Sequence, residues 1–126
     1  MPELTIEAIA VGGGCGSVAR FLVAREMGRL FGSFLPYGTL IVNVLGSLAL
    51  GWMATVFLAR PEINIALRLG IAVGFLGAFT TFSALSFESI QLLFSGAVWR
   101  SVINVAINTV VCLGMCYLGM QLSRLG

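Results

Sequence analysis

The segment GAFTTFSALSFES, residues 77–89, governs the interpretation of this 126-residue chain. It lies inside an apolar stretch from about residue 65 to residue 94, which is long enough for a helix to cross a bilayer. Its thirteen positions nevertheless include two threonines, three serines and a glutamate. Polar groups at bilayer depth are costly unless partnered, and they often mark function. The segment therefore combines a membrane span with a candidate functional site.

Three further apolar stretches flank this one, at about residues 4–24, 37–59 and 98–122. Hydrophobic residues make up 59% of the chain and charged residues 10%, against about 45–50% and 25% in soluble proteins. The runs are continuous and too long for the alternating strands of a membrane barrel. We expect an all-α integral membrane protein, with residues 1–126 forming a single domain of four transmembrane helices joined by short connections.

The third helix is predicted to break near its middle. No charge occurs between Arg68 and Glu88, yet Gly77, the two threonines and Ser83 weaken a helix and offer the backbone alternative hydrogen bonds. Non-helical backbone at this depth is tolerated only where it is buried in protein or lines a cavity. The helix ends at such a break bind anions and cations.

The charged and sulfur-containing residues exclude several classes of function. The net charge is +2, from seven arginines and five glutamates without Lys, Asp or His, so neither nucleic-acid binding nor an enzyme is expected. Cys15, Cys112 and Cys116 all lie in apolar surroundings. They are interpreted as small packing residues rather than a disulfide framework or zinc site. We also expect no cleavable signal peptide, because the N-terminal region is acidic rather than basic.

Arginines are balanced between the two predicted sides of the membrane. The two sets are Arg60, Arg68 and Arg124, and Arg25, Arg29 and Arg100. Because Lys/Arg bias sets orientation, this balance predicts insertion in both directions and permits an antiparallel homodimer. The alternative is a weak bias that other factors resolve. Four helices enclose little by themselves, which favours a pathway at a dimer interface.

Polar residues in the first two spans each allow two interpretations. Asn43 is either a helix–helix hydrogen bond or a donor aimed into a pore. Arg20 either extends its side chain to the membrane surface or forms an electropositive vestibule for an anion. The glycine run VGGGCG, residues 11–16, indicates close helix packing, because it lacks the Lys and preceding strand of a phosphate loop.

The fourth span carries Asn104, Asn108 and Cys112 at spacings of four, so they share one helical stripe. A polar track for a solute and an interhelical zipper both remain open. In the third span, Phe79 and Phe82 are either ordinary core or ring edges that contact an anion weakly.

With GTLIVN at residues 38–43 and GAFTTFSALSFE at residues 77–88, the chain resembles the Fluc (CrcB) family of fluoride channels. The resemblance covers nearly the whole chain. It implies four-helix subunits in the cell (inner) membrane that form antiparallel, dual-topology homodimers. Such a dimer exports fluoride passively from the cytoplasm through two pores, with a structural Na⁺ at its centre.

The resemblance also implies roles for individual residues. Fluoride-pore positions would be Asn43, Phe82, Ser83, Leu85, Asn104, Asn108 and, near a pore mouth, Arg20. Backbone carbonyls of Gly77 and Thr80, from two subunits, would hold sodium. The chain departs from the family pattern Thr-Thr-Phe-Ser-Thr-Phe-Ser, since Ala84 and Leu85 replace the second Thr and Phe. Its fourth helix also has amides where the family usually has a Tyr and Ser/Thr track.

Two other functions remain open from the sequence. A proton-coupled small multidrug exporter also has four spans, but it needs an ionisable carboxylate deep in the membrane. Glu7 and Glu88 both lie away from the centre of their spans. A structural subunit without a transport role would show no ion flux.

Overall fold

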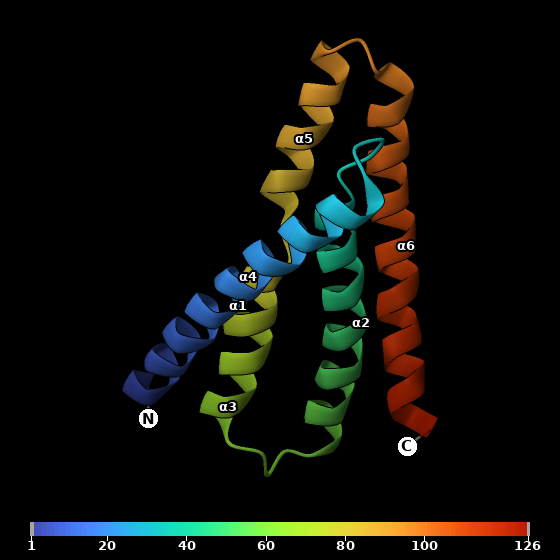
Figure 1. Cartoon of the computed structure of the whole chain (residues 1–126). Coiled ribbons are helices and arrows are strands. Elements are labelled where there is room, and N and C mark those ends of the chain that lie inside the picture. Colours follow the sequence, from blue (N-terminus) through green and yellow to red (C-terminus); the bar gives the residue numbers. More distant parts are fainter. Residues whose placement is uncertain (1, 126) are drawn as a thin grey trace.

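The computed structural model describes residues 2–125, and all the regular structure in that range is helical. Four stretches are long and apolar enough to cross a membrane, namely Leu4–Phe31, Tyr37–Ala59, Ile65–Phe94 and Val98–Leu125. The described ends of the chain and the connection after residue 59 lie at one end of the molecule (Figure 1). The other two connections lie at the opposite end. The predicted all-α architecture with four spans is therefore confirmed.

The helices differ in length and kind. They are α1 (Pro2–Phe31), α2 (Tyr37–Ala59), α3 (Ile65–Leu69), η1 (Gly70–Leu76), α4 (Gly77–Phe79), α5 (Phe82–Phe94) and α6 (Val98–Leu125). The element η1 is a π-helix, a wider form that often occurs at functional sites. The sequence did not predict it. Figure 1 shows α2 and α6 side by side, and this pair has the most extensive contact among the described helices.

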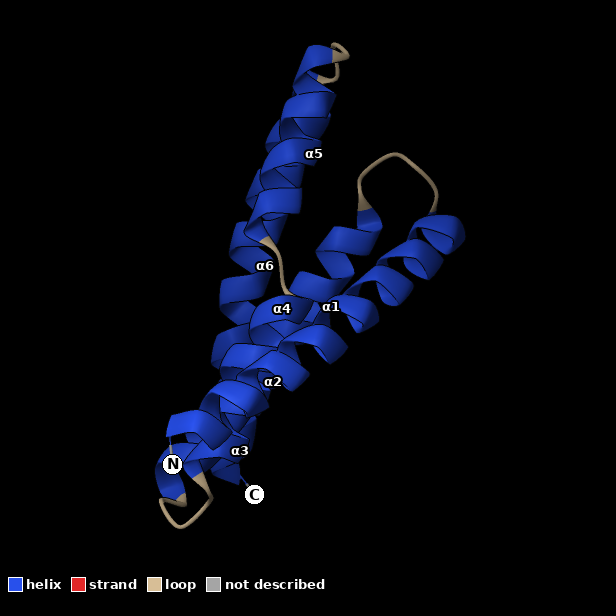
Figure 2. Ribbon diagram, turned by 90° about the vertical axis from the view of Figure 1, so that its left-hand side faces the viewer, coloured by secondary structure: helices blue, strands red, loops and turns tan. Residues whose placement is uncertain are grey.

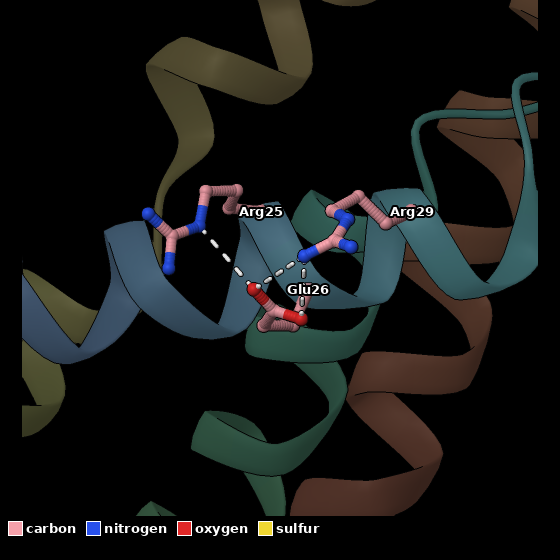
Figure 3. A network of polar contacts seen from close by, with 3 residues as sticks. All are labelled: Arg25, Glu26 and Arg29. Atoms are coloured by element: carbon pink, nitrogen blue, oxygen red, sulfur yellow. Dashed lines mark hydrogen bonds and ion pairs between the residues drawn. The ribbon is translucent and has the colours of Figure 1, made fainter.

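The first helix extends beyond the predicted end of its span at residue 24 and reaches Phe31. Its last two turns carry Glu26, whose carboxylate lies 3.4 Å from Arg25 Nε and 3.3 Å from Arg29 Nη1 (Figure 3). Arg and Glu favour helix. The Glu26–Arg29 pair, three residues apart, adds a little further support at the exposed surface. The helix ends where Gly32 adopts a φ of +85°, a conformation suited to glycine.

Glycines allow the backbones of neighbouring spans to touch. A Cβ at Gly51 of α2 would collide with the carbonyl of Cys116, and one at Gly119 of α6 with that of Leu48. In α1, a Cβ at Gly12 would likewise meet the backbone of η1. Such close approach through small residues is typical of membrane helices. The packing interpretation of the glycine run at residues 11–16 is confirmed at Gly12 and Gly16, whereas Gly14 faces open space.

The interior contains few large apolar side chains, and much of the apolar surface points outward. The buried hydrophobic residues are Leu35, Val42, Leu76, Phe79 and Leu85. Many large hydrophobic residues are exposed along all four spans. In water such a surface would be unfavourable, but in a bilayer lipid chains cover it. The distribution therefore agrees with a multi-pass membrane protein.

Candidate functional site

The backbone between α4 and α5 is extended at two residues (Figure 2). Thr80 has φ −87° and ψ 155°, and Thr81 has φ −151° and ψ 119°. In continuous helix the N–H of Thr81 would donate to Gly77, and the N–H of Ala84 to Thr80. Instead, they donate to Asn43 Oδ1 at 2.8 Å and to Thr81 Oγ1 at 3.1 Å. The carbonyls of Gly77 and Thr80 thus lose these helical donors.

The side chain of Asn43, on α2, replaces the missing helical partners of Thr81. Its Oδ1 accepts from the Thr81 N–H, and its Nδ2 donates to the Thr81 carbonyl oxygen at 3.1 Å. Because a backbone N–H only donates and a carbonyl only accepts, these bonds fix which amide atom faces which group. Asn43 Nδ2 also donates to Asn108 Oδ1 at 3.1 Å. Both amide hydrogens of Asn43 are therefore engaged.

The hydrogen bonds continue from Asn108 as a chain through the interior. Asn108 Nδ2 lies 2.9 Å from the Asn104 carbonyl oxygen and 3.2 Å from Asn104 Oδ1. Asn104 Nδ2 then donates to Ser89 Oγ at 2.9 Å. We call Asn43, Asn108, Asn104 and Ser89 the amide ladder. It links α2, α6 and α5, so the interhelical hydrogen bonds expected as one interpretation of these amides are present.

The amide ladder is almost completely enclosed by protein. The exposed fractions are 9% for Asn43, 3% for Asn108, 0% for Asn104 and 4% for Ser89. Polar groups buried to this degree are costly unless hydrogen-bonded, and each of these side chains makes at least one such bond. The ladder therefore stabilises one arrangement of the three helices.

A cavity of about 450 Å³ lies beside the ladder, between α2, the start of α5 and α6. Of the predicted pore residues, Asn43, Phe82, Leu85 and Asn108 line it, as does Thr80 from the predicted sodium site. Ser83 and Asn104 lie outside its lining. Cys112 and Cys116 also line the cavity and are half-buried, whereas Cys15 is exposed.

The aromatic and hydroxyl residues around the extended segment have different surroundings. Phe79 is buried and stacks on Phe75 with ring centroids 5.9 Å apart, so the core interpretation applies to it. Phe82 is 79% exposed, while Leu85 is 6% exposed. The Ser83 hydroxyl lies 3.3 Å from Thr81 Oγ1.

Arg20 turns toward the protein interior at the end of α4. Its Nε donates to the carbonyl oxygen of Ala78 at 3.0 Å. A second cavity, of about 320 Å³, is lined by Arg20, Thr39, Thr81 and Glu88 among others. Glu88 Oε1 is buried and has no hydrogen-bond partner among residues 2–125. Arg20 and Glu88 thus line the same cavity, and the vestibule role of Arg20 stays a prediction.

Two residues of this site were not singled out from the sequence. Thr81 provides both the backbone held by Asn43 and the side-chain cap of α5. Its place in the Thr-Thr pair was a signal, although nothing distinguished it from Thr80. Ser89 ends the amide ladder, and no local pattern connects it with Asn104, fifteen residues away. Only the packing of α5 against α6 brings these side chains together.

Together, four spans, extended backbone inside the third and a buried polar ladder beside a cavity define a small multi-pass α-helical membrane protein. Residues 7–120 match the model of the family described as CrcB-like protein, Camphor Resistance (CrcB). The chain belongs to this family, which confirms the resemblance drawn from its two motifs.

Several relatives are similar along almost their whole length. A protein from Sulfurihydrogenibium sp. is 38% identical over 117 residues, covering 93% of this chain and 94% of the relative. One from Geobacter metallireducens is 40% identical over 121 residues, covering 96% and 98%. One from Shewanella woodyi is 41% identical over 114 residues, covering 90% and 91%. Each is named fluoride-specific ion channel FluC, which does not favour the multidrug exporter.

Proposed function

We propose that this chain is the subunit of a fluoride-selective channel through which fluoride leaves the cytoplasm passively. The observation that carries the proposal is family membership over residues 7–120, together with relatives named as fluoride-specific channels. A channel, rather than an enzyme, also agrees with a chain that lacks His, Lys and Asp. The cavity beside the extended segment is the candidate for one wall of the pathway.

A fluoride pathway must replace the ion's hydration shell with donors that bind well but not too tightly. Asn43, Asn108 and Phe82 all line the cavity. A fluoride ion would share the Asn43 hydrogen that points to Asn108, as a three-centre bond. The electropositive edge of the phenyl ring would add a weak contact, and Leu85 would form an apolar wall. Ser83 would offer a hydroxyl nearby, and Arg20 would attract anions at the pore mouth.

The functional unit in this proposal is an antiparallel homodimer with dual topology. Phe82 is 79% exposed on one chain although it lines the cavity, so a second copy would close the pathway against it. The equal division of arginines between the two ends supports insertion in both directions. In this proposal the third span serves as a broken helix whose break contributes to the dimer centre.

The residues around Thr80 fit a sodium ion in chemical terms. The carbonyl oxygens of Gly77 and Thr80 lack the helical N–H donors described above, because those donors bind Asn43 and Thr81. Carbonyls released from a helix are ligands that Na⁺ accepts in membrane proteins. One chain supplies two such oxygens, so four ligands would require two subunits. Bound sodium would hold the two copies together at their centre.

Fluoride efflux from liposomes tests the function directly. Purified protein should release fluoride down its gradient and leave chloride inside. Phe82→Ile should lower the fluoride flux or its selectivity over chloride, because it removes the polar ring edge. Ser86→Ala serves as the control, since the Ser86 hydroxyl bonds only to Phe82 O of its own helix and lines neither cavity. A wild-type protein without fluoride flux, or one that passes chloride equally, contradicts the proposal.

A further inference from the structure

We propose that Asn104 and Ser89 form a buried anchor that positions Asn43 and the extended Thr81 from the far end of the amide ladder. The inference rests on the proposed function, because the pathway it acts on is the cavity beside Asn43. It assigns Asn104 to positioning rather than to contact with the ion. The anchor residues lie on α6 and α5, whereas the amide that they position lies on α2.

The direction of the ladder is set by backbone groups at the first two of its three joints. The Thr81 N–H and carbonyl fix the orientation of the Asn43 amide, so Nδ2 of Asn43 must face Asn108. The acceptor there is Asn108 Oδ1, which leaves Asn108 Nδ2 to face Asn104. The Asn104 carbonyl can only accept, which fixes the same orientation independently. Every donor along the ladder therefore points from Asn43 toward Ser89.

Asn104 acts at a distance because it is fully enclosed. Its exposed fraction is 0%, and it lies outside the linings of the cavities next to Asn43 and Arg20. Its Oδ1 accepts from Asn108, and its Nδ2 donates to Ser89. Ser89 is held in turn, since Ser101 Oγ donates to its carbonyl at 2.8 Å. Its side-chain hydrogen bonds connect Asn104 to the cavity-lining residues Asn108 and, beyond it, Asn43.

The test uses two variants that remove the anchor without introducing a charge. Asn104→Leu removes the side-chain acceptor and donor, while the Asn104 carbonyl remains. Ser89→Ala removes the acceptor of the Asn104 amide. Ser86→Ala is the matched control, because it deletes an exposed hydroxyl from the same helix that bonds only within α5. All variants are studied as full-length protein in nanodiscs.

The first readout is hydrogen exchange of the Thr81 amide, followed by NMR in protein labelled with ¹⁵N-threonine. Thr55 and Thr109, inside α2 and α6, serve as internal references for general loosening. We expect Thr81 exchange to accelerate about threefold or more in Asn104→Leu and Ser89→Ala, in line with the loss of one buried hydrogen bond. The reference threonines and the Ser86→Ala protein should remain unchanged.

The second readout is fluoride efflux from liposomes, which should fall in the same two variants and not in Ser86→Ala. Unchanged Thr81 exchange in folded Asn104→Leu and Ser89→Ala proteins would overturn the positioning role. So would equal acceleration at Thr55, Thr81 and Thr109, because that marks general destabilisation. Absence of fluoride flux in the wild type would instead overturn the proposed function, while Thr81 exchange would still decide the positioning role.

Discussion

At the scale of single residues, the Asn43 side chain substitutes for two backbone partners at once. It accepts from the N–H of Thr81 and donates to the carbonyl of the same residue. An extended residue at bilayer depth would otherwise leave both groups unpaired, at about 1–3 kcal/mol each. A primary amide is suited to this position because it carries a donor and an acceptor side by side.

Asn43→Asp tests this role with almost no change in shape. The aspartate would place an oxygen opposite the Thr81 carbonyl and Asn108 Oδ1, so two attractive contacts would become repulsive. We expect fluoride efflux to fall by on the order of tenfold or more and the thermal unfolding temperature in detergent to drop. Thr55→Val, which removes a hydroxyl bonded within α2, should change neither. An aspartate variant with wild-type efflux would contradict the assignment.

At the scale of elements, a helix N-cap marks the point where the extended segment ends and α5 begins. The Thr81 hydroxyl oxygen accepts from the Ala84 N–H and begins α5. N-cap side chains of this kind satisfy an N–H that has no partner inside the helix. Thr81 therefore belongs to both the extended segment and the helix that follows.

Thr81→Ala removes the cap while leaving the backbone that Asn43 holds. We expect it to lower the free energy of unfolding by about 1 kcal/mol and to accelerate hydrogen exchange at Ala84. Thr81→Ser keeps the hydroxyl and should retain most of the protection. Equal exchange in the alanine and serine variants would show that the hydroxyl does not cap α5.

The crossing of α2 and α6 provides a second test at this scale. Gly119→Ala would press a Cβ against the backbone of Leu48 and Trp52, and overpacking of this kind costs about 1–3 kcal/mol. Gly114→Ala is the control on the same helix, because nothing lies within 4 Å of its added Cβ. Thermal unfolding followed by circular dichroism should separate the two. Equal stability would mean that the crossing adjusts without cost.

At the scale of the whole molecule, sequence and structure agree on the four spans, because continuous apolar runs and helix length are local properties. The longer α1 and the π-helix η1 were not predicted, since the first depends on charged residues that favour helix and the second on contacts with α1. The stripe formed by Asn104 and Asn108 was visible from their spacing. The pairing of Asn108 with Asn43 and of Asn104 with Ser89 was not visible, because it depends on how the helices pack together.

The proposed dual topology predicts that added positive charge will impair the channel. Ser95→Lys with Ala97→Lys should bias insertion to one orientation, and Glu62→Lys with Ile63→Lys to the other. A reporter fused to the C-terminus should detect both orientations in the wild type and one in each variant. Fluoride efflux should fall in each biased variant alone and recover on co-expression. A wild type with a single orientation and full fluoride efflux would contradict the dimer proposed here.

The one-way course of the amide ladder also has an evolutionary consequence. Because each amide offers its donor to the next residue, one position cannot change its hydrogen-bonding character without leaving a neighbour unpaired. Positions 43, 89, 104 and 108 should therefore vary together among related sequences. Chains that lack the amide at position 108 should also differ at position 104 or 89. Related sequences should therefore show a few fixed combinations of residues at these four positions.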